Sequence, residues 1–187
     1  MMRIALWILG ALLLGGIVHL STVLAMPSAA NQDAYSRLSQ NTPVNAVVPL
    51  PAASGQDAAM PFMDPAFAVA VCRYDLSPGV LKLRAPLSQA YTTVTFYTRN
   101  SVAYYAINDR AAGRRAIELD LMTPEQRAQV PEEEDVTAAD RLIIESPTER
   151  GLIVLRALAP EPSLMAMARR ALAGAQCRIE ALPTHQD

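Results

Sequence analysis

One stretch of the chain has no charged residue over 22 positions, and the sequence after it alternates between apolar and polar side chains. This uncharged stretch, residues 4–25, reads IALWILGALLLGGIVHLSTVLA. As a helix it would be about 33 Å long, enough to cross a hydrocarbon core of about 30 Å. No later apolar run approaches this length. The pattern therefore predicts one transmembrane helix, with residues 1–26 forming a membrane anchor.

A cleaved signal peptide is the alternative interpretation of this stretch. Arg3 gives it a positive start, and Val23-Leu24-Ala25 fits a small-residue cleavage site. The apolar core is longer than in a typical signal peptide, where it has about 7–15 residues, which favours a retained anchor. Arg3 lies before the stretch, and the next basic residue is Arg37. The expected location is the cytoplasmic membrane, crossed once through residues 4–25, with the carboxyl-terminal part in the periplasm.

A proline-rich segment follows the uncharged stretch. Residues 27–61 combine several prolines with Ser, Asn, Gln and Ala and show no hydrophobic periodicity. Such a composition is typical of an extended tether. We expect this linker to lead into a β-rich domain at residues 62–182, followed by a polar tail at residues 183–187.

Alternation of apolar and polar residues predicts the strands of this domain. Residues 80–85 place Leu81 and Leu83 on one face and the two charged side chains between and after them on the other. Residues 67–74 are almost continuously apolar, which is typical of a strand buried on both faces. The turn at Pro78-Gly79 joins these two runs and predicts a hairpin. Further strands are expected at residues 91–98, 102–107, 115–121, 142–145 and 152–157.

Two helices are expected beside these strands. A short helix begins after Thr123, which forms a T-x-x-Q capping box with Gln126. Residues 162–175 carry apolar side chains at helical spacing and predict a terminal helix. The short turns between strands favour antiparallel pairing. The predicted fold is mainly β: an antiparallel β-sandwich or curled sheet with the C-terminal helix packed on it, preceded by one N-terminal transmembrane helix.

Charge and composition exclude several functions. The chain has 16 basic and 18 acidic residues, a net charge of −2, and no cluster of Lys or Arg longer than a pair. Nucleic acid is therefore not expected as a partner, because phosphate binding needs a concentrated basic patch. The sequence has no phosphate-binding GKS/T loop, and we expect no cofactor. The acidic run at residues 132–135 is expected to be a solvated loop.

The two cysteines, Cys72 and Cys177, predict a disulfide bond. An even number of cysteines outside the cytoplasm usually indicates pairing. Cys72 lies in the first predicted strand of the domain, and Cys177 follows the terminal helix directly. The two meet if that helix folds back over the sheet. The alternative is two separate buried thiols that behave as small hydrophobic groups.

Catalysis by histidine is not expected. His19 lies in the uncharged stretch and His185 in the tail, so neither can act as a base inside the domain. Hydrolysis by Ser-His-Asp or Cys-His groups is therefore not expected, and no metal site is expected. Carboxylates remain as candidates for glycosidic chemistry, although their spacing does not pair them: Asp64, Asp75, Asp109, Glu118 and Asp120.

One small ligand pocket is a candidate, at the ends of two predicted strands. Its residues are Arg73, Tyr74, Asp75, Asn108 and Asp109. The competing interpretation is structural. An arginine at a strand end commonly forms an ion pair, and aspartates in turns bond their own backbone.

The tyrosines offer a second candidate surface, for a sugar or a lipid. They are Tyr91, Tyr97, Tyr104 and Tyr105. Tyrosine is also a frequent strand residue, and the pattern favours this plainer explanation.

Asp64-Pro65, the run AVCRYDLSPG, the strand YTTVTFYTRNS and the strand-turn YYAIND together resemble a bacterial domain-of-unknown-function family, DUF1254. The resemblance covers residues 62–158. Many members have Trp at the position of Thr92, whereas the only Trp here is Trp7. The resemblance implies a β-rich fold, an envelope location, a short membrane-anchored form with the first β-domain only, and a sister protein. It implies no chemistry for particular residues.

Two functions follow from these expectations. The first is a non-catalytic, membrane-anchored β-domain that acts as a binding or accessory subunit with a sister membrane or envelope protein. The second is a carboxylate-dependent enzyme acting on an envelope glycan or lipid. A buried cleft with two carboxyl groups about 5–10 Å apart would indicate the enzyme, and an apolar patch the subunit. The sequence favours the subunit.

Overall fold

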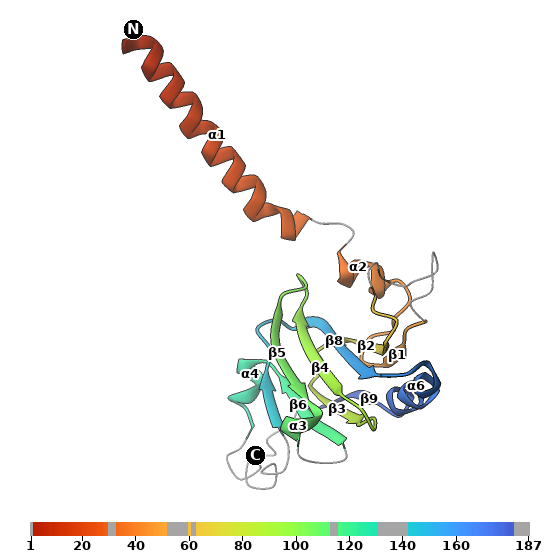
Figure 1. The fold of residues 1–187 in the computed structure, drawn as a ribbon. Coiled ribbons are helices and arrows are strands. Elements are labelled where there is room, and N and C mark those ends of the chain that lie inside the picture. Colours follow the sequence, from red (N-terminus) through yellow and green to blue (C-terminus); the bar gives the residue numbers. More distant parts are fainter. Residues whose placement is uncertain are drawn as a thin grey trace. The chain divides into compact units, whose positions relative to one another are not determined.

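The computed structural model describes residues 2–29, 33–51, 60, 63–112, 116–130 and 142–181 (Figure 1). The chain divides into two compact units, Met1–Asp33 and Ala34–Asp187. Each unit is described by itself below. The acidic run at residues 132–135 and the predicted tail at residues 183–187 lie outside the described residues.

The first unit consists of helix α1, Met2–Ala29. Its segment Met2–Met26 has a mean hydropathy of 2.1, and none of it is buried. The segment is long and apolar enough to cross a membrane, by length and composition. An N-terminal signal sequence has the same features.

The second unit contains two β-sheets (Figure 1). The strand order is β1-β2-β8-β4-β5 in the five-stranded sheet and β7-β6-β3-β9 in the four-stranded sheet. All neighbours pair antiparallel except β6 and β7, which are parallel. The strands are β1 (Val47–Pro49), β2 (Phe67–Asp75), β3 (Val80–Pro86), β4 (Thr92–Thr98), β5 (Ala103–Asn108), β6 (Ala116–Met122), β7 (Leu142–Glu145), β8 (Arg150–Leu158) and β9 (Gln176–Glu180).

Short helices complete the second unit: α2 (Ala34–Ser39), α3 (Asp109–Ala112), α4 (Pro124–Arg127), the 3-10 helix η3 (Pro162–Leu164) and α6 (Met165–Ala173). The predicted capping box of α4 is confirmed. The Gln126 backbone N–H donates to Thr123 Oγ1 at 3.2 Å, and the Thr123 N–H donates to Gln126 Oε1 at 2.9 Å. Gln126 Nε2 also donates to the carbonyl of Leu76 at 2.7 Å, so the box ties α4 to the turn between β2 and β3.

One hydrophobic core lies between the two sheets. Alternate residues of the strands point into it, and their charged neighbours point out, because successive strand side chains face opposite ways. Helix α6 adds Ala168 and Leu172 to this core. The predicted fold class is therefore confirmed: the domain is mainly β, has two packed sheets and a C-terminal helix, and follows a long apolar helix. The largest core side chains include Tyr74, Phe96, Leu81, Leu119, Leu121, Ile153 and Leu155.

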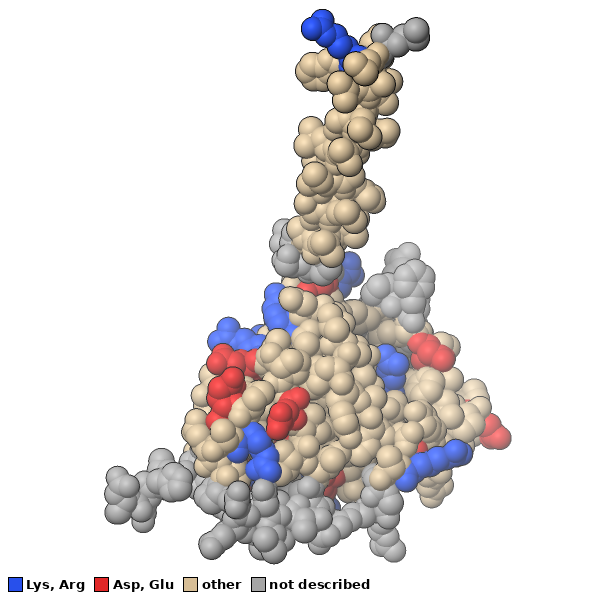
Figure 2. Space-filling view, turned by 90° about the vertical axis from the view of Figure 1, so that its left-hand side faces the viewer, with Lys and Arg blue, Asp and Glu red and all other residues tan. Residues whose placement is uncertain are grey.

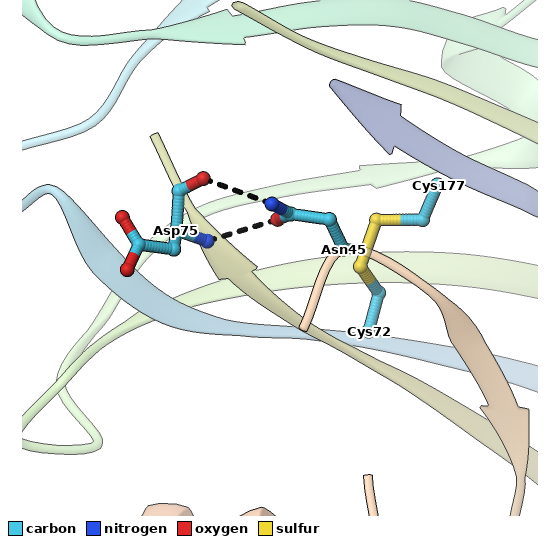
Figure 3. Close-up of a disulfide and its surroundings, with 4 residues drawn as sticks. All are labelled: Asn45, Cys72, Asp75 and Cys177. Carbon is cyan, nitrogen blue, oxygen red and sulfur yellow. Dashed lines mark hydrogen bonds between the residues drawn. A yellow bond between two sulfur atoms is a disulfide. The ribbon is translucent and has the colours of Figure 1, made fainter. Parts of the chain in front are cut away.

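The predicted disulfide between Cys72 and Cys177 is confirmed (Figure 3). It joins β2 of the five-stranded sheet to β9 of the four-stranded sheet, with the two Cα atoms 6.5 Å apart. Both cysteines are buried. The bond therefore holds the two layers of the sandwich together through the core.

The predicted hairpin of residues 67–74 and 80–85 is wrong. Strand β2 pairs with β1 and β8, whereas β3 lies in the other sheet and pairs with β6 and β9. The turn after Asp75 crosses from one layer to the other, and Leu76 is fully buried there. A turn reverses the chain, but it does not decide whether the flanking strands share a sheet.

The predicted linker is wrong over residues 34–50. Helix α2 buries Tyr35 and Leu38 on the five-stranded sheet, and β1 pairs with β2. Asn45 continues this pairing: its N–H donates to the carbonyl of Arg73 at 2.7 Å. Its side chain bonds the N–H and the C=O of Asp75 at 2.9 and 3.1 Å (Figure 3). The segment covers the edge of β2, so it is part of the domain.

Candidate functional site

The five residues of the predicted ligand pocket are not brought together. Arg73, Tyr74 and Asp75 end β2, whereas Asn108 and Asp109 lie at the junction of β5 and α3. Strands β8 and β4 lie between β2 and β5, so about 14 Å separates the two groups across the sheet at roughly 4.8 Å per strand.

The groups are also displaced along the strands. Asn108 is level with Thr93, Arg156 and Val69, four residues away from Arg73 on β2. Alternation separates the first group further, because Tyr74 points into the core while its two neighbours are half-buried on the outer face. The prediction grouped residues that end two predicted strands. Such positions need not lie close together across a sheet.

Tyr74 instead belongs to a buried hydroxyl cluster. Its hydroxyl lies 3.0 Å from Ser146 Oγ and 3.2 Å from the Tyr104 hydroxyl, and it donates to the carbonyl of Tyr97 at 3.3 Å. Burial raises the pKa of Tyr104 far above its usual value, so this group stays protonated. Gly151 allows the cluster to form, because a Cβ there would collide with the Tyr74 ring and the carbonyl of Tyr97. Tyr74 and Ser146 are fully buried, whereas Tyr104 is half-buried.

The other tyrosines do not form one aromatic surface. Tyr104 and Tyr105 pack on Phe96, with ring centroids 6.2 and 6.0 Å apart. Tyr97 lies on the outer face of the five-stranded sheet, and Tyr91 is exposed before β4. These placements agree with tyrosine acting as a strand residue.

Most of the candidate carboxylates serve structural roles. Arg150 Nε lies 2.8 Å from Asp75 Oδ2, and Arg84 Nε lies 2.9 Å from Glu118 Oε1. Lys82 contacts Asp120 in the same way. Burial raises the pKa of Asp75, but the Ser77 hydrogen bonds and Arg150 outweigh it and hold the pKa below its usual value.

Two acidic candidates remain. Asp64 accepts the N–H of Ala66 at 2.9 Å in a turn. Asp109 begins α3, and its Oδ1 is buried without a hydrogen-bond partner among the described residues. Among the described residues, no group of three or more His, Cys, Asp or Glu side chains could hold a metal ion. These observations give no support to a carboxylate active site in the described part of the chain.

The first feature open to a partner is the free edge of β5. No described strand pairs with its outer side. Its sequence, AYYAIN, contains no charged residue, and Ala103 and Ala106 are exposed. Figure 2 shows the domain from the side where β5 lies in Figure 1, and uncharged residues occupy the middle of that side.

The second open feature is an apolar hollow of about 460 Å³ on the outer face of the five-stranded sheet. We call it the outer groove. Its floor consists of outward-facing side chains of β2, β8 and β4. Its walls come from α2 and from Met60, Met63, Asp64 and Phe67. The floor residues are Val69, Val71, Tyr97, Leu152 and Val154.

The sequence contained a signal for the outer groove. Residues 67–74 are apolar on both faces, which predicted burial on both faces. The structure shows that one face meets the core and that the other is covered in part by α2. The uncovered part of that second face is the groove floor.

The fold is a two-sheet β-domain that follows an apolar N-terminal helix in the sequence. The family model described as "Protein of unknown function (DUF1254)" matches residues 44–178. The chain belongs to this family, and the predicted resemblance is confirmed. No curated protein matches the chain.

Two solved structures are similar to this chain. The VPA0106 protein from Vibrio parahaemolyticus matches with a TM-score of 0.59 and 11% identity, over 82% of this chain and 36% of that one. An uncharacterized protein from Burkholderia cenocepacia matches with a TM-score of 0.48 and 11% identity, over 82% of this chain and 43% of that one. The chain thus spans less than half the length of either protein, and the first match shows the fold alone.

Proposed function

We propose that this protein is a non-catalytic accessory subunit of the bacterial envelope that binds a partner protein through the open edge of β5. In this proposal α1 anchors the chain in the cytoplasmic membrane and the domain faces the periplasm. The uncharged helix with Arg3 before it supports this orientation. The Cys72–Cys177 bond supports it as well, because structural disulfides persist mainly in oxidising compartments.

The observation that carries the proposal is the contrast between the edges of the two sheets. An exposed edge presents unpaired N–H and C=O groups, and proteins usually protect it with charges, proline or a cover. Edge strand β1 has Pro49, and edge strand β9 has the exposed Arg178 and Glu180. Strand β5 contains no charged residue and no proline, and no described strand covers its outer side. An edge of this kind is suited to accept a strand from another protein.

The enzyme alternative has less support. The acidic candidates Asp75, Glu118 and Asp120 are each held by a basic side chain. A catalytic acid needs access to the substrate and a suitable pKa. Burial raises the pKa of Asp75, but hydrogen bonds from Ser77 and the ion pair with Arg150 outweigh it and hold the pKa below its usual value. A general acid near neutral pH requires the opposite.

The partner can be tested by substitution on the edge. The full chain, tagged and expressed in its native membrane, is purified in mild detergent after brief crosslinking. We expect one protein to co-purify in a constant ratio, and Ala106→Lys to reduce its recovery at least fivefold, because an edge lysine disfavours strand addition. Gln176→Lys is the matched control, since it adds the same charge at an exposed position of edge strand β9.

Neither substitution should change stability by more than about 0.5 kcal/mol, because both positions are exposed. A monomeric protein that co-purifies with nothing would remove the basis of the proposal. Equal recovery with Ala106→Lys and Gln176→Lys would keep the subunit but reject β5 as its docking edge.

The orientation needs a separate test. A reporter that is active only in the periplasm is fused after residue 181 and should be active, while a cytoplasmic reporter at the same position should not. Mass spectrometry of the mature protein should find residues 4–25 retained. A mature chain that begins at Met26 would leave export intact but would reject the anchor.

A further inference from the structure

We propose that the outer groove binds one long-chain amphiphile of the fatty-acid class, with its hydrocarbon chain on the sheet and its anionic head at Arg156. This inference goes beyond the proposed partner and uses a different surface. The groove lies on the outer face of the five-stranded sheet, whereas the proposed partner pairs with the edge strand β5.

The floor of the groove offers no hydrogen bonds. Its side chains are apolar apart from the Tyr97 hydroxyl, and they come from strands whose backbones are already paired. Strand β8 is bonded on both sides, by β2 and by β4. A peptide laid on this floor would bury N–H and C=O groups that find no partner, which is unfavourable. A hydrocarbon chain has no such groups.

The volume of the groove also favours a hydrocarbon chain over a peptide helix as the ligand. A two-turn helix about 10 Å across and about 11 Å long fills about 850 Å³. The hollow of about 460 Å³ is little more than half of that. At about 30 Å³ per methylene, similar to the volume share of a water molecule, the hollow holds a chain of roughly 15 carbons. Met60 and Met63 line it as well, and their flexible side chains adapt to an irregular ligand.

Charge identifies the polar end of the ligand. Among the described lining residues, Arg156 is the only base and Asp64 the only acid. Arg156 is exposed and forms no ion pair with another described residue, whereas Asp64 already accepts the Ala66 N–H. Guanidinium groups bind carboxylate and phosphate oxygens with two parallel hydrogen bonds. The head that fits is therefore anionic and lies at the Arg156 end of the floor.

A source of such ligands follows from the proposed anchor. Only residues 30–33 separate α1 from α2 in the sequence. Helix α2 supplies Ala34 and Leu38 to the groove wall. In the proposed location, the bilayer that holds α1 supplies amphiphiles of this class.

The test uses the full chain in nanodiscs of phosphatidylcholine. The probe is palmitic acid that carries a photoactivatable diazirine near the end of its chain. After illumination, mass spectrometry of peptides should locate the label on residues 60–71 and 150–156. Val154→Trp fills the floor and Val154→Lys charges it, so each should reduce this label at least fivefold. Gln176→Lys should leave it unchanged.

A second probe tests the head group. Arg156→Gln should reduce labelling by the acid at least threefold, while labelling by the matching diazirine alcohol should stay the same. Label confined to peptides of α1, or groove label that both Val154 variants leave intact, would overturn the proposal. Groove label that is insensitive to Arg156→Gln would overturn the assignment of the head. Ala106→Lys should not change labelling, so failure here is distinguishable from failure of the partner proposal.

Discussion

Replacing Cys72 and Cys177 by alanine should remove at least about a third of the domain's free energy of unfolding. The bond joins β2 and β9, which lie in different sheets, so it closes the sandwich from one layer to the other. No hydrogen-bonded ladder connects these two strands. In the variant, β9 is held only by β3 and by its packing in the core.

The magnitude follows from the length of the closed loop. The two cysteines are 105 positions apart. The chain-entropy model assigns a loop of about 100 residues roughly 4.7 kcal/mol, because the crosslink restricts the unfolded chain. Domains of this kind have a total free energy of unfolding of about 5–15 kcal/mol. The bond therefore accounts for a third of that free energy or more.

Urea unfolding of the full chain in detergent measures the effect. Near-ultraviolet circular dichroism follows the tyrosines, all of which lie outside the uncharged stretch. With a slope of about 2 kcal/mol per molar urea, the midpoint should fall by about 2 M. The unsubstituted chain, measured oxidised and fully reduced, is the matched control and should show a similar shift.

Two results would refute this reasoning. A midpoint shift below about 0.3 M, at that same slope, would mean that the crosslink restricts little in the unfolded chain. Two free thiols titrated in the unreduced, denatured protein would mean that Cys72 and Cys177 are not bonded in the membrane-derived protein.

Three further predictions concern single side chains in the same unfolding assay. Gly151→Ala should cost about 1–3 kcal/mol, because the added Cβ collides with the backbone carbonyl of Tyr97; a neutral result would contradict the close packing. Asn45 has a φ of 56°, so Asn45→Ala should be about 1 kcal/mol less stable than Asn45→Gly, and equal stabilities would show that the backbone relaxes. The pKa of Asp75 is lowered from 3.8, so its stabilising effect is present above that pH and disappears as the pH falls through the lower folded value. The difference between wild type and Asp75→Asn should therefore shrink below about pH 4, and a constant difference would contradict the ion pair.

Local alternation predicted which side chains face the core. In β3, Leu81 and Leu83 are buried, while Lys82 and Arg84 point outward and meet acids of β6. This information is contained in five consecutive residues, because a strand repeats every two residues. The capping box at Thr123 was equally local, and it too was predicted correctly.

Strand pairing was not local, and there the prediction failed. The longest ladder of β2 is formed with β8, and Asp75 is level with Arg150. Nothing within β2 or its turn indicates this distant partner. The same limitation explains why the five residues of the candidate pocket are not brought together. Neighbours in a strand, such as Arg73 and Tyr74, point to opposite faces of the sheet.

Two elements, α2 and β9, were not predicted, although the spacing of their apolar residues indicates both. The prolines of residues 27–61 indicated a linker, although Tyr35 and Leu38 are three apart, as on one face of a helix. Cys177 and Ile179 alternate with polar residues, as expected for a strand, and they lie in β9. Both segments are short, and each adopts its regular structure because it packs on one of the sheets.

The treatment of the two edges of the five-stranded sheet supports the idea that β5 is reserved for a partner. At one edge, residues 44–50 cover β2 with a short strand, the side chain of Asn45 and Pro49. Asn45 adopts an unfavourable positive φ to complete this cover. At the other edge, β5 has no charge and no covering strand among the described residues. A chain that accepts backbone strain to close one edge would be expected to protect the other, unless another protein pairs with it.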